Sequence, residues 1–72
     1  MNNEIIQILS DASNFLKDKK WQQVNEIYQN AILKFPDQHE IYHAFGIALV
    51  QQNNPKQAIE KFLHAIKLDP DN

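Results

Sequence analysis

The chain has no cysteine, one glycine and three prolines among its 72 residues. Without cysteine, neither a disulfide framework nor thiolate chemistry is available to it. The scarcity of glycine and proline predicts long regular segments joined by short turns. Apolar residues do not alternate along the chain as they do in half-buried strands, so these segments are expected to be helices.

Charge and hydropathy exclude two further classes of protein. Seven Lys and Arg residues against nine Asp and Glu residues give a formal net charge of -2, whereas a nucleic-acid-binding face is normally basic. The longest apolar run, residues 44–50, is far too short to cross a bilayer. The first residues also lack the basic start of a signal peptide. We therefore expect a cytoplasmic domain that binds neither nucleic acid nor membrane.

Apolar residues recur at helical spacing in four successive segments. They predict an all-α fold with four helices, at about 3–17, 20–34, 38–52 and 55–68. Asn54, followed by Pro55 at the first helical position, has the chemistry of an N-cap for the fourth helix, and Asp37 is expected to cap the third. The joints between helices are short, so neighbouring helices should pack antiparallel.

The two halves of the chain match one another at a constant offset of 34 residues. The matched pairs are Ile8 and Tyr42, Ala12 and Gly46, Phe15 and Leu49, Val24 and Ala58, Tyr28 and Phe62, Ala31 and Ala65, and Pro36 and Pro70. This period, in a helix-turn-helix unit, resembles the tetratricopeptide repeat. Residues 39–72 carry the pattern almost in full. Residues 5–38 are more degenerate, with Asp11 where a large apolar residue is usual.

The resemblance implies a single domain over residues 1–72, built as a tetratricopeptide-like α-α superhelix. It would contain two antiparallel helix-turn-helix repeats, at about 5–38 and 39–72. In this family, the first helix of each repeat lines a concave groove that commonly binds peptide segments of partner proteins. The positions that match this groove are Ile6, Leu9, Ser13, Leu16 and Lys17, and then Glu40, His43, Ile47, Val50 and Gln51. The alternative is that the apolar members of this set simply pack between the two first helices.

Residues 39–43 read HEIYH, which is the H-E-x-x-H pattern of zinc-dependent proteases. The extended form of that motif needs a third histidine at position 49, where this chain has Leu49. Tyr42, Gly46 and Leu49 are all accounted for by the repeat pattern. We therefore expect no catalytic residue, no cofactor and no functional metal site. At most, His39 and His43 would bind a transition metal weakly and adventitiously.

The end of the chain raises a separate question. Residues 69–72 correspond to residues 35–38, which lead into the next predicted helix, so one flank of helix 55–68 is expected to lack a covering helix. Two explanations stay open. The chain is a piece of a longer protein, or the flank pairs with itself in a homodimer. The second explanation gives the alternative function, a homo-oligomerisation or scaffold unit.

Overall fold

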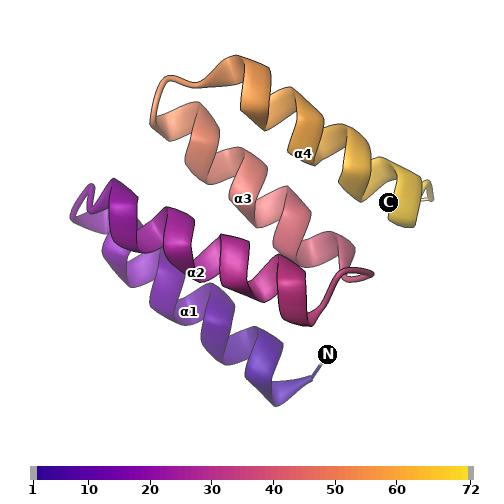
Figure 1. Ribbon diagram of the computed structural model, residues 1–72, viewed down its shortest axis with the longest axis horizontal. Coiled ribbons are helices and arrows are strands. Elements are labelled where there is room, and N and C mark those ends of the chain that lie inside the picture. The colour runs from indigo at the N-terminus through magenta and orange to yellow at the C-terminus, as the bar shows by residue number, and fades with distance from the viewer. Residues whose placement is uncertain (1, 72) are drawn as a thin grey trace.

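The computed structural model describes residues 2–71, which form two helical hairpins packed side by side (Figure 1). The helices are α1 (Asn3–Lys17), α2 (Trp21–Lys34), α3 (His39–Gln51) and α4 (Pro55–Leu68). Residues 2–71 contain no strand. The all-α fold and its four antiparallel helices are confirmed, with each predicted boundary within one residue of the observed one.

The two hairpins turn in the same way. The backbone is left-handed at Lys19 (φ 56°) and at Asn53 (φ 61°), which are 34 positions apart in the sequence. In the first turn the N–H of Lys20 donates to the carbonyl oxygen of Phe15 at 3.0 Å, and in the second the N–H of Asn54 donates to that of Leu49 at 2.9 Å. The backbone therefore repeats at the offset found in the sequence.

The helix starts differ from the predicted caps. The N-cap of α3 is Gln38 and not Asp37, and no side chain caps this helix. Asn54 does occupy the N-cap position of α4, and Pro55 is the first helical residue, but the Asn54 side chain makes no capping hydrogen bond. A capping residue normally has an extended backbone, whereas Asn54 has ψ 70° because its N–H closes the preceding turn. The only side-chain cap in residues 2–71 is at α1, where Asn2 Oδ1 accepts from the Glu4 N–H at 2.6 Å.

The core lies between the hairpins, and α3 is its central element because it contacts α1, α2 and α4. The ring of Phe45 on α3 stacks on Tyr28 of α2, with centroids 5.2 Å apart. Burial of this apolar surface is the main force that holds the hairpins together. The buried apolar residues are Ile5, Ala12, Val24, Tyr28, Ala31, Ile41, Tyr42, Phe45, Ala48, Leu49, Ala58 and Ala65.

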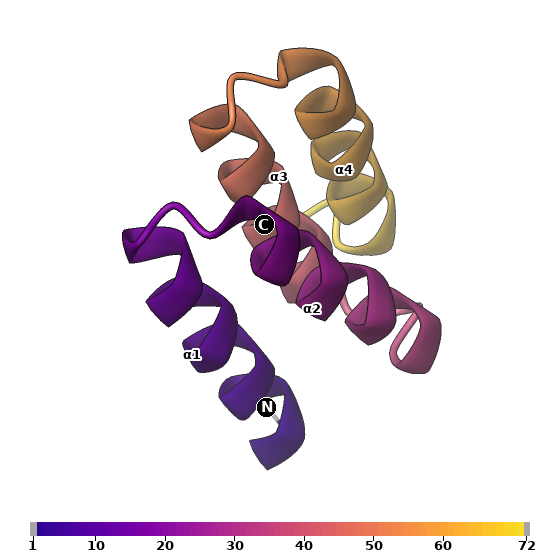
Figure 2. The ribbon, with the colours of Figure 1, turned by 60° about the vertical axis from the view of Figure 1, so that its left-hand side comes forward.

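The hairpins differ in how they are covered. Figure 2 shows α1 and α4 at opposite sides of the molecule, with α2 and α3 between them. Consequently α3 packs against the first hairpin, whereas no helix of the described chain packs on the corresponding face of the second hairpin. Within residues 2–71, this asymmetry leaves one face of α4 uncovered.

Candidate protein-binding surfaces

The predicted groove residues form five pairs, one member on α1 and the other 34 positions later on α3. Three apolar members are exposed: Ile6 at 51%, Ile47 at 40% and Val50 at 54%. Leu9 and Leu16 are half-buried and pack against the core. We considered above that these apolar residues simply pack between the first helices of the two repeats. That alternative fits Leu9 and Leu16, but it does not fit the three exposed residues.

The polar members of the predicted groove border this apolar surface. Glu40 is half-buried, and its side chain is 28% exposed. The remaining polar members are exposed, and they are Ser13, Lys17, His43 and Gln51. Together with the three exposed apolar residues they define a surface on α1 and α3 that we call the first-helix face. Its binding of a partner stays a prediction.

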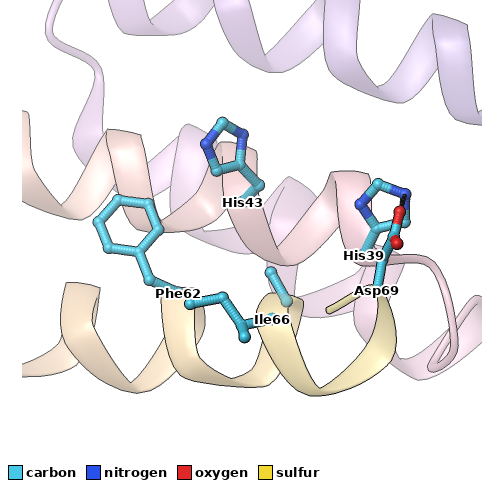
Figure 3. A pocket seen from close by; sticks show the side chains of 6 residues that line it. His39, His43, Phe62, Ile66 and Asp69 are labelled. Atoms are coloured by element: carbon cyan, nitrogen blue, oxygen red, sulfur yellow. Dashed lines mark ion pairs between the residues drawn. The ribbon is translucent and has the colours of Figure 1, made fainter. Parts of the chain in front are cut away.

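The two histidines of HEIYH have separate surroundings (Figure 3). The Nε2 atom of His39 lies 3.0 Å from Asp69 Oδ2 and 3.5 Å from Glu40 Oε1. The ring of His43 is tilted against that of Phe62, with centroids 5.8 Å apart. Among residues 2–71, no group of three His, Asp or Glu side chains is placed to hold a metal ion.

A pocket of about 410 Å³ opens between α3 and α4. Figure 3 shows His39 beside Asp69 at one end, and His43 near Phe62 at the other. The lining residues are His39, His43, Phe62, Ala65, Ile66 and Asp69. The positions 34 residues earlier are all buried or half-buried, and they are Ile5, Leu9, Tyr28, Ala31, Ile32 and Phe35. The pocket is thus the uncovered counterpart of the surface that α3 covers on the first hairpin.

An exposed apolar row runs along α4 beside this pocket. Ile59 is 56% exposed, Leu63 is 61% exposed and Ile66 is 55% exposed. Their spacing of four and then three residues puts them on one side of the helix. All three are among the apolar residues that predict a helix at 55–68, and only their exposure in the structure distinguishes them from core residues. We call Ile59, Leu63 and Ile66 the α4 row.

Sequence reasoning missed one exposed apolar residue, Leu33 on α2, which is 82% exposed. It borders a second pocket of about 290 Å³, whose other lining residues are Gln29, Ile32, Phe45, Gln57 and Lys61. The available signal was its spacing, because Leu33 does not share the helical spacing of Val24, Tyr28 and Ala31, which are buried.

The buried tyrosines are neutral under ordinary conditions. Burial raises the pKa of Tyr28, and burial followed by the negative charge of Asp37 raises the pKa of Tyr42. The Tyr42 hydroxyl donates a hydrogen bond to the carbonyl oxygen of Pro36 at 3.0 Å, which ties α3 to the preceding loop. The ring of Tyr42 also stacks on His64 of α4, with centroids 4.0 Å apart. These two contacts hold α3 against the preceding loop and against α4.

Comparisons with known proteins agree with this geometry. The family model described as tetratricopeptide repeat matches residues 39–72. No curated protein and no solved structure matches the chain. No helix within residues 2–71 has both the length and the apolar character needed to cross a membrane. Residues 39–72, which comprise α3 and α4, are a tetratricopeptide repeat.

Proposed function

We propose that the first-helix face binds an apolar or amphipathic segment of a partner protein, and that the chain acts without catalysis. Tetratricopeptide repeats generally mediate protein–protein interactions and are typically non-catalytic. The observation that carries the proposal is the exposure of Ile6, Ile47 and Val50 on α1 and α3. Exposed apolar residues that gather on one surface, with polar groups around them, are typical of an interaction site.

The chemistry of this face favours an apolar ligand. Full burial of one large aliphatic side chain contributes about 1.5–3 kcal/mol, so covering three half-exposed ones contributes on the order of 2–4 kcal/mol. Lys17, Glu40 and Gln51 then offer a cation, an anion and an amide at the edge, where hydrogen bonds set the register of the bound segment. An extended peptide or a short amphipathic helix fits this distribution.

We also propose that residues 5–38 are a second, degenerate repeat of the same domain. Two observations support this reading. The turns at residues 18–20 and 52–54 share a left-handed residue and two backbone hydrogen bonds at equivalent positions, and α2 begins and ends 34 positions before α4. A first-helix face needs both repeats, because Ile6 belongs to α1 and its other exposed apolar members belong to α3.

Peptides selected on the wild-type chain from a displayed library provide the test. The double variant Ile47→Lys and Val50→Lys should lose binding to the selected peptides while its far-ultraviolet circular dichroism stays helical. Leu33→Lys is the matched control, because it places the same charge at an exposed apolar position on α2. Unchanged binding by the double variant would show that the first-helix face is not the site.

Self-association is a second candidate function, and the α4 row favours it. A row of exposed aliphatic side chains on one helix lowers the solubility of an isolated monomer. Such a row is normally buried in contact with another protein surface. This function differs from the first in both its site and its partner, since it uses α4 and a copy of the same chain.

A further inference from the structure

The charged side chains of this molecule are sorted between its two ends. The four helices run antiparallel, so the two hairpin turns lie together at one end, and the α2–α3 loop lies at the other end with both ends of the chain (Figure 1). We call residues 17–20 and 51–56 the turn end. We call residues 2–5, 34–40 and 67–71 the loop end.

The two ends have opposite net charges. The turn end has four lysines and one aspartate, a net side-chain charge of +3, and these residues are Lys17, Asp18, Lys19, Lys20 and Lys56. The loop end has five acidic residues and two lysines, a net side-chain charge of -3 with histidine neutral. The acidic residues are Glu4, Asp37, Glu40, Asp69 and Asp71, and the lysines are Lys34 and Lys67. Protonation of His39 would still leave the loop end at -2.

The helix macrodipoles do not oppose this separation of charge. At the turn end α1 and α3 end while α2 and α4 begin, and at the loop end the reverse holds. Each end therefore combines two positive and two negative helix termini, whose partial charges cancel. The side chains alone determine which end is positive.

The first-helix face extends from one end to the other. Lys17 is its member at the turn end, on α1, and Glu40 is its member at the loop end, on α3. None of its other members is Asp, Glu, Lys or Arg. Lys17 is exposed and takes part in none of the ion pairs within residues 2–71. Glu40 Oε1 lies 3.5 Å from His39 Nε2 and accepts no hydrogen bond from the described part of the chain.

We propose that the segment bound on the first-helix face has an apolar centre, an acidic side chain toward the turn end and a basic side chain toward the loop end. This inference rests on the proposed function and specifies the chemistry of its ligand. A segment placed this way is attracted at both ends, whereas the reverse placement brings like charges together at both ends. The charge separation therefore sets the direction in which the segment lies.

The distance between Lys17 and Glu40 along the helices sets the length of this segment. Lys17 occupies the same repeat position as Gln51, which is 11 residues beyond Glu40. At 1.5 Å per residue, the two levels are about 16 Å apart along the helix axis. An extended segment covers this distance in about five residues and a helical one in about eleven. Because salt screens exposed charges beyond about 8 Å, each charge acts on its own end of the ligand.

Peptides selected on the wild-type chain from a displayed library test the chemistry of the ligand. Among peptides whose binding is lost in the Ile47→Lys and Val50→Lys double variant, we expect opposite charges on the two sides of the apolar centre, at either of these spacings. Peptides that depend on Ile47 and Val50 but lack such charges would overturn this inference and leave the proposed function standing. If no selected peptide depends on these two residues, the proposed function fails as well.

Exchange of the two charges tests the direction. Lys17→Glu combined with Glu40→Lys keeps the net charge, but it should weaken binding of the selected peptides by about five- to tenfold, because two exposed attractions become repulsions. Peptides whose own two charges are exchanged should bind this variant as the original peptides bind the wild type. Glu60→Lys combined with Lys61→Glu makes the same exchange on α4 and should bind like the wild type.

Fluorescence anisotropy with labelled peptides measures these affinities, and circular dichroism checks that each variant is helical. If the double exchange reduces helicity, Lys17→Glu alone repeats the test at an exposed position, with an expected loss of about threefold. The differences should shrink as sodium chloride is raised to about 0.5 M, because salt screens exposed charges. Equal affinity of the wild type and the exchanged variant for both peptide sets would overturn the proposed direction.

Discussion

Lys19 and Asn53 hold the same left-handed backbone conformation in the two hairpin turns, with φ values of 56° and 61°. Asparagine tolerates this conformation, whereas in lysine the Cβ atom comes too close to the backbone and raises the energy of the folded state. Lys19→Gly should therefore raise the free energy of unfolding by about 0.5–1 kcal/mol. Asn53→Gly should have a smaller effect. Urea denaturation followed by circular dichroism measures both.

The neighbouring residue provides the control for this prediction. Lys20 has a φ of -86°, which every residue adopts without strain. Lys20→Gly should change the free energy of unfolding by no more than a few tenths of a kcal/mol, because the larger backbone entropy that glycine loses on folding is offset by its preference for the N-cap position that Lys20 occupies. Equal effects of glycine at positions 19 and 20 would show that the left-handed conformation of Lys19 does not matter for stability.

Gly46 gives a second prediction, because a Cβ at this position would lie 2.5 Å from Cε1 of Phe62. Gly46→Ala should therefore destabilise the wild type by about 1–2 kcal/mol, despite the better helix propensity of alanine. In a Phe62→Ala background the ring is absent, so the same change should stabilise α3 by up to about 1 kcal/mol. Urea denaturation of the four proteins in dilute solution measures the coupling. Stabilisation by Gly46→Ala in both backgrounds would show that close contact does not select glycine here.

The sequence predicted the elements of this fold well, for a physical reason. The 34-residue offset relates residues that have the same neighbours, such as Tyr28 and Phe62, so it fixes helix ends and helix contacts together. The capping preferences of individual residues predicted the helix starts less well. Asp37 and Asn54 have suitable side chains, but the hydrogen bonds of each turn set the backbone angles and decide whether a side chain reaches the helix start.

The candidate sites were less predictable. The exposure of Ile59 and Ile66 depends on what covers α4, because the corresponding residues of the covered first hairpin, Asn25 and Ile32, are half-buried. Apolar residues at helical spacing look the same in the sequence whether or not another helix covers them. The contact of His39 with Asp69 joins two residues 30 positions apart in sequence. In the first hairpin the same positions are Ile5 and Phe35, so the repeat itself gave no indication of a polar contact there.

The HEIYH segment gives a third prediction, on zinc. His39 is engaged by Asp69, while His43 packs against Phe62, so the two imidazoles are not held as a pair of ligands. Zinc should bind with a dissociation constant no tighter than tens of micromolar, far weaker than structural or catalytic zinc sites. Isothermal titration calorimetry measures this directly, with His43→Gln as the control. Submicromolar binding that His43→Gln abolishes would reinstate a metal site.

The buried tyrosines give a prediction on pH. The pKa values of Tyr28 and Tyr42 are raised above 10.0 in the folded chain, chiefly by burial. Because the folded state favours the neutral phenol, this contribution to stability is fully present below about pH 10. It is lost as the pH rises through the folded-state pKa values. The free energy of unfolding should therefore fall above pH 10, as measured by urea denaturation at successive pH values.

Tyr42→Phe separates the hydroxyl from the ring in this pH dependence. At pH 7 the variant should lose about 1 kcal/mol, because the hydrogen bond to the Pro36 carbonyl is gone while the stacking on His64 remains. Above pH 10 its stability should fall less steeply than that of the wild type, because one fewer buried phenol resists ionisation. Tyr28→Phe is the companion variant, and it should also flatten the alkaline decline. An alkaline decline of equal steepness in all three proteins would assign the effect to lysine deprotonation instead.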